Sequence, residues 1–223
     1  MTIPRNLSNL APGASGGGVL SASYGGTGLT SPGTAGNVLT SNGTGWASSA
    51  APGGGSWIYL STVTASNVAT ADIETTFSST YNNYAIVASA VSTVSNARLR
   101  MRFKVSGSYS SSSLYMYVVI FNKTTSTTPT GQGQTIEPDI QIVPQSTNQA
   151  NLAHNFICYV YNAPSTSLYK TVNIVGQSWD DDNISNFITT ATYKDTPAVT
   201  GVRIFAATGN LSGTFRLYGI KNS

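Results

Sequence analysis

The sequence predicts an all-β protein: a jelly-roll-like antiparallel sandwich preceded by an extended glycine-rich N-terminal arm. Three observations lead to this fold class. Segments rich in Val, Ile, Thr, Tyr and Phe recur along the chain, no heptad pattern or 12-residue amphipathic stretch occurs, and 14 of the 22 glycines fall within residues 1–56. The glycine distribution places a boundary near Ser56, between an arm (1–56) and a body (57–223).

The arm cannot fold as an independent domain. Residues 1–56 contain one charged residue, Arg5, and few large apolar side chains, so they bury too little surface to offset an ordering cost of about 1–2 kcal/mol per residue. We expect the arm either to be a disordered linker or to be a strand-like segment that orders against other chains. Glycine at many positions lets backbones approach closely, which suits several chains wound about one axis.

Within the arm, short apolar pieces alternate with turn residues. Residues 38–46 predict a small hairpin whose Asn42-Gly43 pair suits a type I′ turn. The Gly25-x-x-Gly28 spacing does not indicate a phosphate-binding loop, because no apolar strand precedes it, no helix follows it, and the lysine of such loops is absent. We therefore expect no cofactor.

The body is expected to be a single β-sandwich. Eight to eleven strands in 167 residues fit one antiparallel sandwich, most naturally a jelly roll. A domain of this size buries about two-thirds of its unfolded surface and can fold unaided. The expected strands are 57–64, 70–77, 84–94, 97–105, 114–121, 140–143, 155–161, 168–175, 187–193, 202–207 and 214–220.

The clearest alternation occurs at residues 97–105. Period two places four apolar residues on one face of this strand and four cations on the other. These cations predict either a contact for an anionic partner or a solvated outer face that discourages edge pairing. The partner would be an acidic polysaccharide, an acidic neighbouring subunit or this chain's own residues 180–182. The four cations are Arg98, Arg100, Arg102 and Lys104.

Three further features are candidate contacts for a glycan or a partner. The run Trp179-Asp180-Asp181-Asp182 offers oxygen ligands for Ca²⁺ and an aromatic ring for a sugar, but it lacks the spacing of an EF-hand, and a plain surface loop is the alternative. Tyr109 lies in the polar stretch 108–113, an exposed loop of the kind in which binding contacts are common. The tyrosine pairs 115/117 and 159/161 are read as core, with a glycan platform or a subunit interface as the alternative.

The sequence does not predict an enzyme. His154 has no nucleophile at a defined spacing, and Cys158 is read as a core thiol. Two carboxylate pairs at i, i+2 have a spacing that fits a glycosidase, but solvated surface is the favoured interpretation. Because the chain has one histidine and one cysteine, it cannot build a four-ligand zinc site of these residues. The carboxylate pairs are Asp72 with Glu74 and Glu137 with Asp139.

Charge and hydropathy exclude two classes of partner. With 11 basic and 8 acidic residues the chain has a net charge of +3 and no basic block, so we expect no nucleic-acid binding. No apolar run approaches the roughly 18 residues of a membrane span, and the first ten residues do not resemble a cleaved signal. We therefore expect a soluble protein without membrane insertion.

Residues 25–52, GGTGLTSPGTAGNVLTSNGTGWASSAAP, resemble the glycine-rich connector of tail-fibre and related virion proteins of tailed bacteriophages. In the body, FSSTYNNYAIVASAV from Phe77 and GTFRLYGIK from Gly213 are similar to the opening and closing strands of a jelly-roll-like domain of phage appendage proteins. The resemblance implies a homotrimeric virion component, made in the host cytoplasm and located on the tail or the capsid surface.

The function that the resemblance implies is host attachment by a tail-fibre-like receptor-binding protein. Other virion proteins would bind residues 1–56, and a host surface polysaccharide would be the receptor. The alternative is a capsid decoration protein, a cement or head-fibre protein that projects a trimeric β knob. A chain of 223 residues beginning at Met1 is short for a full fibre, which favours decoration or a small accessory fibre. A polysaccharide depolymerase is a remote alternative.

Overall fold

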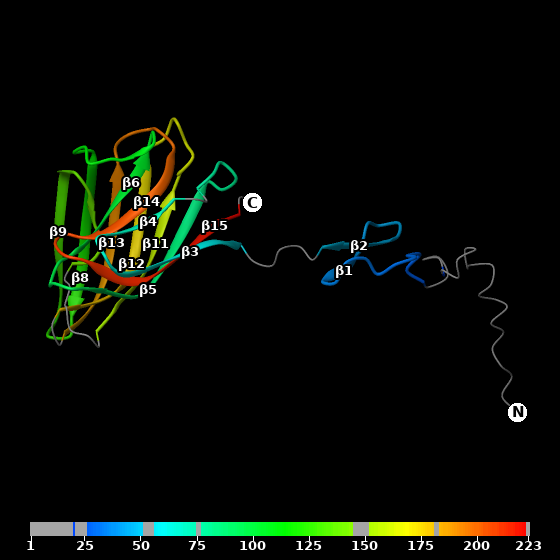
Figure 1. Ribbon diagram of the computed structural model, residues 1–223, viewed down its shortest axis with the longest axis horizontal. Coiled ribbons are helices and arrows are strands. Elements are labelled where there is room, and N and C mark those ends of the chain that lie inside the picture. The colour runs from blue at the N-terminus through cyan, green and yellow to red at the C-terminus, as the bar shows by residue number, and fades with distance from the viewer. Residues whose placement is uncertain are drawn as a thin grey trace, which may run out of the picture. The chain divides into compact units, whose positions relative to one another are not determined.

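The computed structural model describes residues 20, 26–50, 56–74, 77–144, 152–180 and 183–221. The regular structure in these ranges is entirely β, and the chain divides into two compact units, Met1–Gly55 and Ser56–Ser223 (Figure 1). Among the described residues, no helix is long and apolar enough to cross a membrane. The prediction of an all-β protein is confirmed.

The first unit contains the predicted hairpin, formed by β1 (Asn37–Ser41) and β2 (Trp46–Ala50). Its turn is not the two-residue type I′ turn. The side-chain oxygen of Asn42 accepts hydrogen bonds from the backbone N–H groups of Thr44 at 3.0 Å and Gly45 at 2.8 Å, which closes a four-residue loop. Gly43 supplies the positive φ of 89° within that loop. Most of the other arm residues, which carry the predicted attachment and trimerisation, lie outside the described residues.

The larger layer of the second unit is an eight-stranded antiparallel sheet. The strand order is β3-β15-β5-β11-β12-β13-β8-β9, so neighbouring strands are often distant in sequence. The first and last strands of the body, β3 and β15, pair directly. The strands are β3 (Trp57–Val68), β5 (Asn83–Thr93), β8 (Tyr115–Lys123), β9 (Ser126–Glu137), β11 (His154–Tyr161), β12 (Lys170–Asp180), β13 (Asn183–Tyr193) and β15 (Leu211–Ile220).

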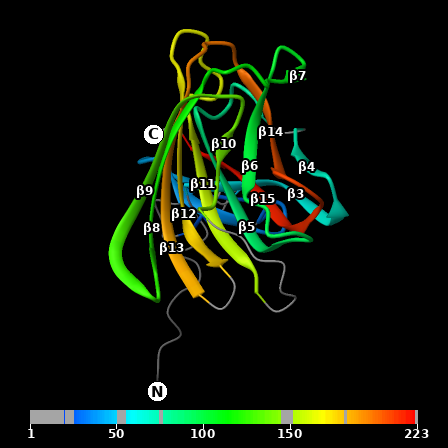
Figure 2. The ribbon, with the colours of Figure 1, turned by 90° about the vertical axis from the view of Figure 1, so that its left-hand side faces the viewer.

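The smaller layer is an antiparallel sheet in the order β10-β6-β14-β4, with β7 paired to β6. Figure 2 shows this layer packed against the larger sheet, so the predicted sandwich is confirmed. Below, the large sheet and the small sheet mean these two layers. The strands of the small sheet are β4 (Thr70–Ile73), β6 (Leu99–Val105), β7 (Ser108–Tyr109), β10 (Ile140–Gln141) and β14 (Val199–Ala206).

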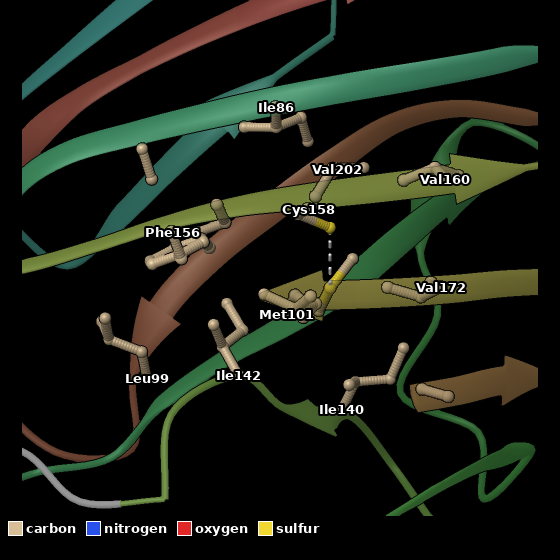
Figure 3. Close-up of a cluster of buried hydrophobic side chains, with 14 of the residues drawn as sticks. Ile86, Leu99, Met101, Ile140, Ile142, Phe156, Cys158, Val160, Val172 and Val202 are labelled. Carbon is tan, nitrogen blue, oxygen red and sulfur yellow. Dashed lines mark hydrogen bonds between the residues drawn. The ribbon is translucent and has the colours of Figure 1, made fainter. Parts of the chain in front are cut away.

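The core lies between the two sheets and follows the period-two pattern of their strands. On β6, Leu99, Met101 and Phe103 are fully buried, as the alternation predicts. Met101 meets Cys158 of the large sheet, with 4.0 Å between their sulfur atoms, in the middle of a cluster of Val, Ile and Phe side chains (Figure 3). The hydroxyl of Tyr115 accepts a hydrogen bond from the Phe103 backbone N–H at 2.9 Å, which satisfies the buried phenol.

Close packing explains one glycine of the large sheet. A Cβ atom at Gly176 on β12 would lie 2.4 Å from the backbone oxygen of Asn155 and 2.5 Å from the Cβ of Phe156, both on β11. The two strands can approach as they do because residue 176 has no side chain. A substitution there is expected to force these strands apart.

A buried lysine joins two loops at one end of the sandwich. The Nζ of Lys170 donates to the backbone oxygens of Ser165 at 2.6 Å, Leu168 at 2.8 Å and Thr196 at 2.8 Å. All three donors of the ammonium group are thereby used, so the side chain is fully buried without an unsatisfied donor. Lys170 serves the fold and is not available to a ligand.

Candidate interaction surfaces

The predicted cationic stripe lies on the outward face of the small sheet, where it meets carboxylates of the same chain. Arg100 Nη1 lies 2.5 Å from one carboxylate oxygen of Asp139, and Arg102 Nη2 lies 3.3 Å from the other. Asp139 is only 4% exposed, so this carboxylate depends on the two guanidinium groups for its charge balance. Arg98 donates to the side-chain oxygen of Gln141 at 3.3 Å.

The other end of the stripe is neutralised in the same way. Lys104 Nζ lies 2.8 Å from Glu74, and the Tyr109 hydroxyl donates to the same carboxylate at 2.5 Å. These two donors hold the pKa of Glu74 below its usual value. Burial and the hydrogen bond to Glu74 hold the pKa of Tyr109 above its usual value. Tyr109 is therefore part of the fold's ion-pair network and not a free binding contact.

A fourth arginine, on the central strand β14, completes the network. Arg203 forms a bidentate pair with Asp72, at 2.7 Å and 2.6 Å, and its guanidinium carbon lies 3.9 Å from the centre of the Tyr109 ring. In the strand register Arg203 lies opposite Arg102 on one side and Asp72 on the other. Arg102 and Arg203 on the two central strands are thus flanked by Asp72 on β4 and by Asp139, which directly precedes β10.

These contacts correct one sequence interpretation. The described ion pairs of the stripe are made with Glu74 and Asp139, so the outer face is not simply solvated. The side chains of the acidic run at 180–182 lie outside the described residues, and their pairing with the stripe stays a prediction. Asp72 and Glu74 engage separate cations, and the lowered pKa of Glu74 opposes a role as a general acid.

The two other residues considered for catalysis are buried. The Nδ1 atom of His154 accepts a hydrogen bond from the Trp179 backbone N–H at 3.2 Å, and burial lowers the pKa of His154 to about 4. Burial raises the pKa of the Cys158 thiol to about 12, so the thiolate is scarce at neutral pH. The reading of Cys158 as a core thiol is confirmed.

The acidic run lies where β12 turns into β13. Trp179 is part of β12 and not of a loop, and Asp180 ends that strand opposite Asn183. Asp181 and Asp182 lie outside the described residues. Within the described ranges, no group of three or more His, Cys, Asp or Glu side chains is placed to hold a metal ion. The predicted sugar or calcium contact at this run stays a prediction.

The outward face of the large sheet takes no part in the ion-pair network and carries exposed apolar side chains. The sequence analysis did not predict this surface. A row of aliphatic side chains crosses five strands, one residue per strand, because each is directly opposite the next in the register. Three of them are about half exposed: Ile120 and Ile188 at 49% and Val175 at 46%. From β8 to β5 this aliphatic row is Ile120, Ile188, Val175, Ile157 and Val87.

An aromatic cluster adjoins the aliphatic row on the same face. Its rings pack edge to face, tilted or stacked, with centroids 5.7–6.2 Å apart. Ala85 points outward between Tyr159 and Tyr218 in the register and is nevertheless fully buried. Tyr159 and Tyr161 therefore do not belong to the core, whereas Tyr115 and Tyr117 do. The cluster consists of Trp57, Tyr59, Tyr159, Tyr161 and Tyr218.

A signal for this face was present in the sequence. The segments around Ile120, Ile157 and Val175 have apolar residues at both odd and even positions, which means that both faces of those strands are apolar. Comparison with known proteins adds no assignment: no family model, curated protein or solved structure matches the chain.

Proposed function

We propose that this chain is a structural protein of a bacteriophage virion, a homotrimeric tail-fibre-like protein that attaches the particle to its host. The observation that carries the proposal is the glycine-rich connector at residues 25–52, whose hairpin is formed by β1 and β2. It precedes a separate β-sandwich that begins at Ser56. This order of parts suits a protein whose arm attaches to the virion and whose body contacts the host.

Attachment would use many weak contacts. The chain is rich in Ser, Thr and Asn, whose hydroxyl and amide groups match those of a polysaccharide. Each such hydrogen bond contributes about 0.5–1.5 kcal/mol net. Three copies per trimer and many trimers per particle raise the overall affinity by about 10²–10⁴-fold. Because the cationic stripe is paired internally, binding to the host should depend little on salt.

The test is adsorption of the purified full chain to host cells across ionic strength. We expect saturable adsorption that is nearly the same at low and high salt, and loss of incorporation into particles when residues 1–56 are deleted. Absence of adsorption at every salt concentration, together with normal infection by particles lacking the protein, would reject host attachment.

Capsid decoration is the second candidate. It is favoured by the outward face of the large sheet, whose exposed Val and Ile side chains suit contacts with protein better than contacts with sugar. Electron microscopy of particles carrying a tagged copy separates the two functions. A tag at the tail supports attachment, and a tag spread over the capsid supports decoration.

A further inference from the structure

We infer that the copies of this chain turn the outward faces of their large sheets toward a common axis, where each face packs against the same face of its neighbours, and that this contact joins the sandwiches of the assembled protein. The inference rests on the proposed homotrimer for the number of copies. It goes beyond that proposal by naming the surface, which is the aliphatic row together with the aromatic cluster.

The aliphatic row is the first argument. A sheet face that stays in water normally alternates with the core face and carries polar side chains. Here Ile120, Ile188 and Val175 are about half exposed and adjacent to one another in the register, so they form one contiguous patch. A patch of this kind marks a surface that is covered in the working assembly.

The charge distribution indicates what covers it. Among the described residues that point outward from β3, β15, β5, β11, β12, β13 and β8, the charged one is Arg216, at the end of the aliphatic row beside Val87. A basic or acidic partner would meet almost no charged side chain on this face with which to form an ion pair. A copy of the same face meets it without charge repulsion, and depletion of charge with enrichment in Tyr, Trp and aliphatic residues is typical of interfaces between identical subunits.

The size of the face is sufficient. Eight strands about 4.8 Å apart, crossed by four outward rows, give a surface of about 34 Å by about 25 Å, or roughly 850 Å² per copy. A stable interface buries about 800 Å² on each partner. The whole face, of which the aliphatic row and the aromatic cluster are a part, is therefore of the size that one copy buries in a stable interface.

The aromatic cluster lies at the end of the face where the chain enters the sandwich. Trp57 opens β3 directly after the arm, and it contacts both Tyr159 and Tyr218. Copies that are joined through residues 1–56 hold this end of their faces at high local concentration. The contact between sandwiches would begin here and continue along the aliphatic row.

The test is the oligomeric state of residues 56–223, the compact unit that contains the whole described core and lacks the arm, with Ile188→Arg. It is measured by light scattering and analytical ultracentrifugation over a range of concentrations. The matched control is Leu168→Arg, because Leu168 is similarly exposed, at 54%, but lies in the loop before β12. We expect the wild type and Leu168→Arg to be oligomers at micromolar concentration. Ile188→Arg should dissociate at protein concentrations at least 100-fold higher. Circular dichroism establishes that each variant is folded.

A second variant distinguishes a loss of association from a loss of folding. Ile188→Thr keeps a β-branched side chain and should weaken association about tenfold while remaining folded. A monomeric wild type at all concentrations would overturn the inference, as would an oligomer that Ile188→Arg leaves intact, which would mean that the copies meet elsewhere or that residues of the same chain cover the face. Neither outcome decides host attachment, which the adsorption measurement tests separately.

Discussion

The outward faces of the small sheet and the large sheet are both built from alternating strands, but they differ in charge. The small-sheet face carries many charged side chains, and the large-sheet face carries almost none. Of the chain's 11 basic and 8 acidic residues, five basic and three acidic residues gather in the network on the small sheet. The described outward positions of the large sheet from β3 to β8 carry one charge, Arg216. The chain has few charged residues, and they are concentrated on one sheet instead of being spread evenly over both. The charges of the small-sheet face are paired within the chain, whereas the large-sheet face presents exposed aliphatic and aromatic side chains.

The largest effect is expected where the small-sheet network is most buried. Asp139→Asn removes the charge that balances Arg100 and Arg102, leaving two half-buried guanidinium groups without their partner. We expect the free energy of unfolding to fall by about 2 kcal/mol. Urea denaturation measures it, with Glu137→Gln two residues earlier as the control. Equal stability of the two variants would mean that the network does not stabilise the small sheet.

An arginine-to-lysine exchange on each face compares the two directly. Arg203→Lys loses the bidentate pair with Asp72 and the contact with Tyr109, which should cost about 1 kcal/mol. Arg216→Lys on the large sheet loses only a hydrogen bond to Ser89 at 3.2 Å, and we expect its stability to be nearly unchanged. Thermal unfolding measures the stability of both variants. Equal losses of stability for Arg203→Lys and Arg216→Lys would contradict this contrast.

A smaller effect should depend on pH. The folded-state pKa of Glu74 is lowered below 4.5, so its pairing with Lys104 and Tyr109 adds stability above pH 4.5 that is lost as the pH falls through the folded pKa. Because the pair is about one-third exposed, we expect less than about 1 kcal/mol. Unfolding of the wild type and Glu74→Gln from pH 7 to pH 2 should converge at the acid end. A difference that is constant over this range would show that Glu74 acts through packing.

The smallest effect is expected on the large sheet, for the fold of a single copy. Ile188→Thr removes an outward side chain that packs against no core, so the unfolding free energy of the dissociated protein should change by less than about 0.5 kcal/mol. Hydrogen exchange at dilutions where the protein is monomeric measures this. A large loss of protection would mean that the aliphatic row supports the fold itself and not association.

The core could be predicted from the sequence, but the partners of charged residues could not. The alternation at residues 97–105 gave both the buried and the outward side chains of β6. Lys104 and Glu74 are 30 residues apart, and Arg100 and Asp139 are 39 apart; these pairs form only because the sheet order is β10-β6-β14-β4. Periodicity describes one strand at a time, and the order of strands in a sheet is a long-range property.

The same limit explains the missed surface and a missed strand. The aliphatic row exists only through the register of five strands, so no single segment displays it. Strand β9 was not expected because Ser126–Glu137 contains Pro129, Gly131 and Gly133, which are unfavourable in strands. It forms nonetheless as an edge strand that pairs only with β8, where such residues are tolerated.

The pairing of β3 with β15 has a mechanical consequence. The chain enters the sandwich at Ser56, whose backbone oxygen accepts from the Lys221 N–H at 2.8 Å, and β3 then runs beside β15 from Trp57 to Val68. Tension applied at residue 56 along β3 while the body is held elsewhere loads the hydrogen bonds of this ladder in shear. Bonds loaded in shear must break together and not one after another. A pull directed along β3 therefore acts in the direction in which the first strand of the sandwich is most resistant to extraction.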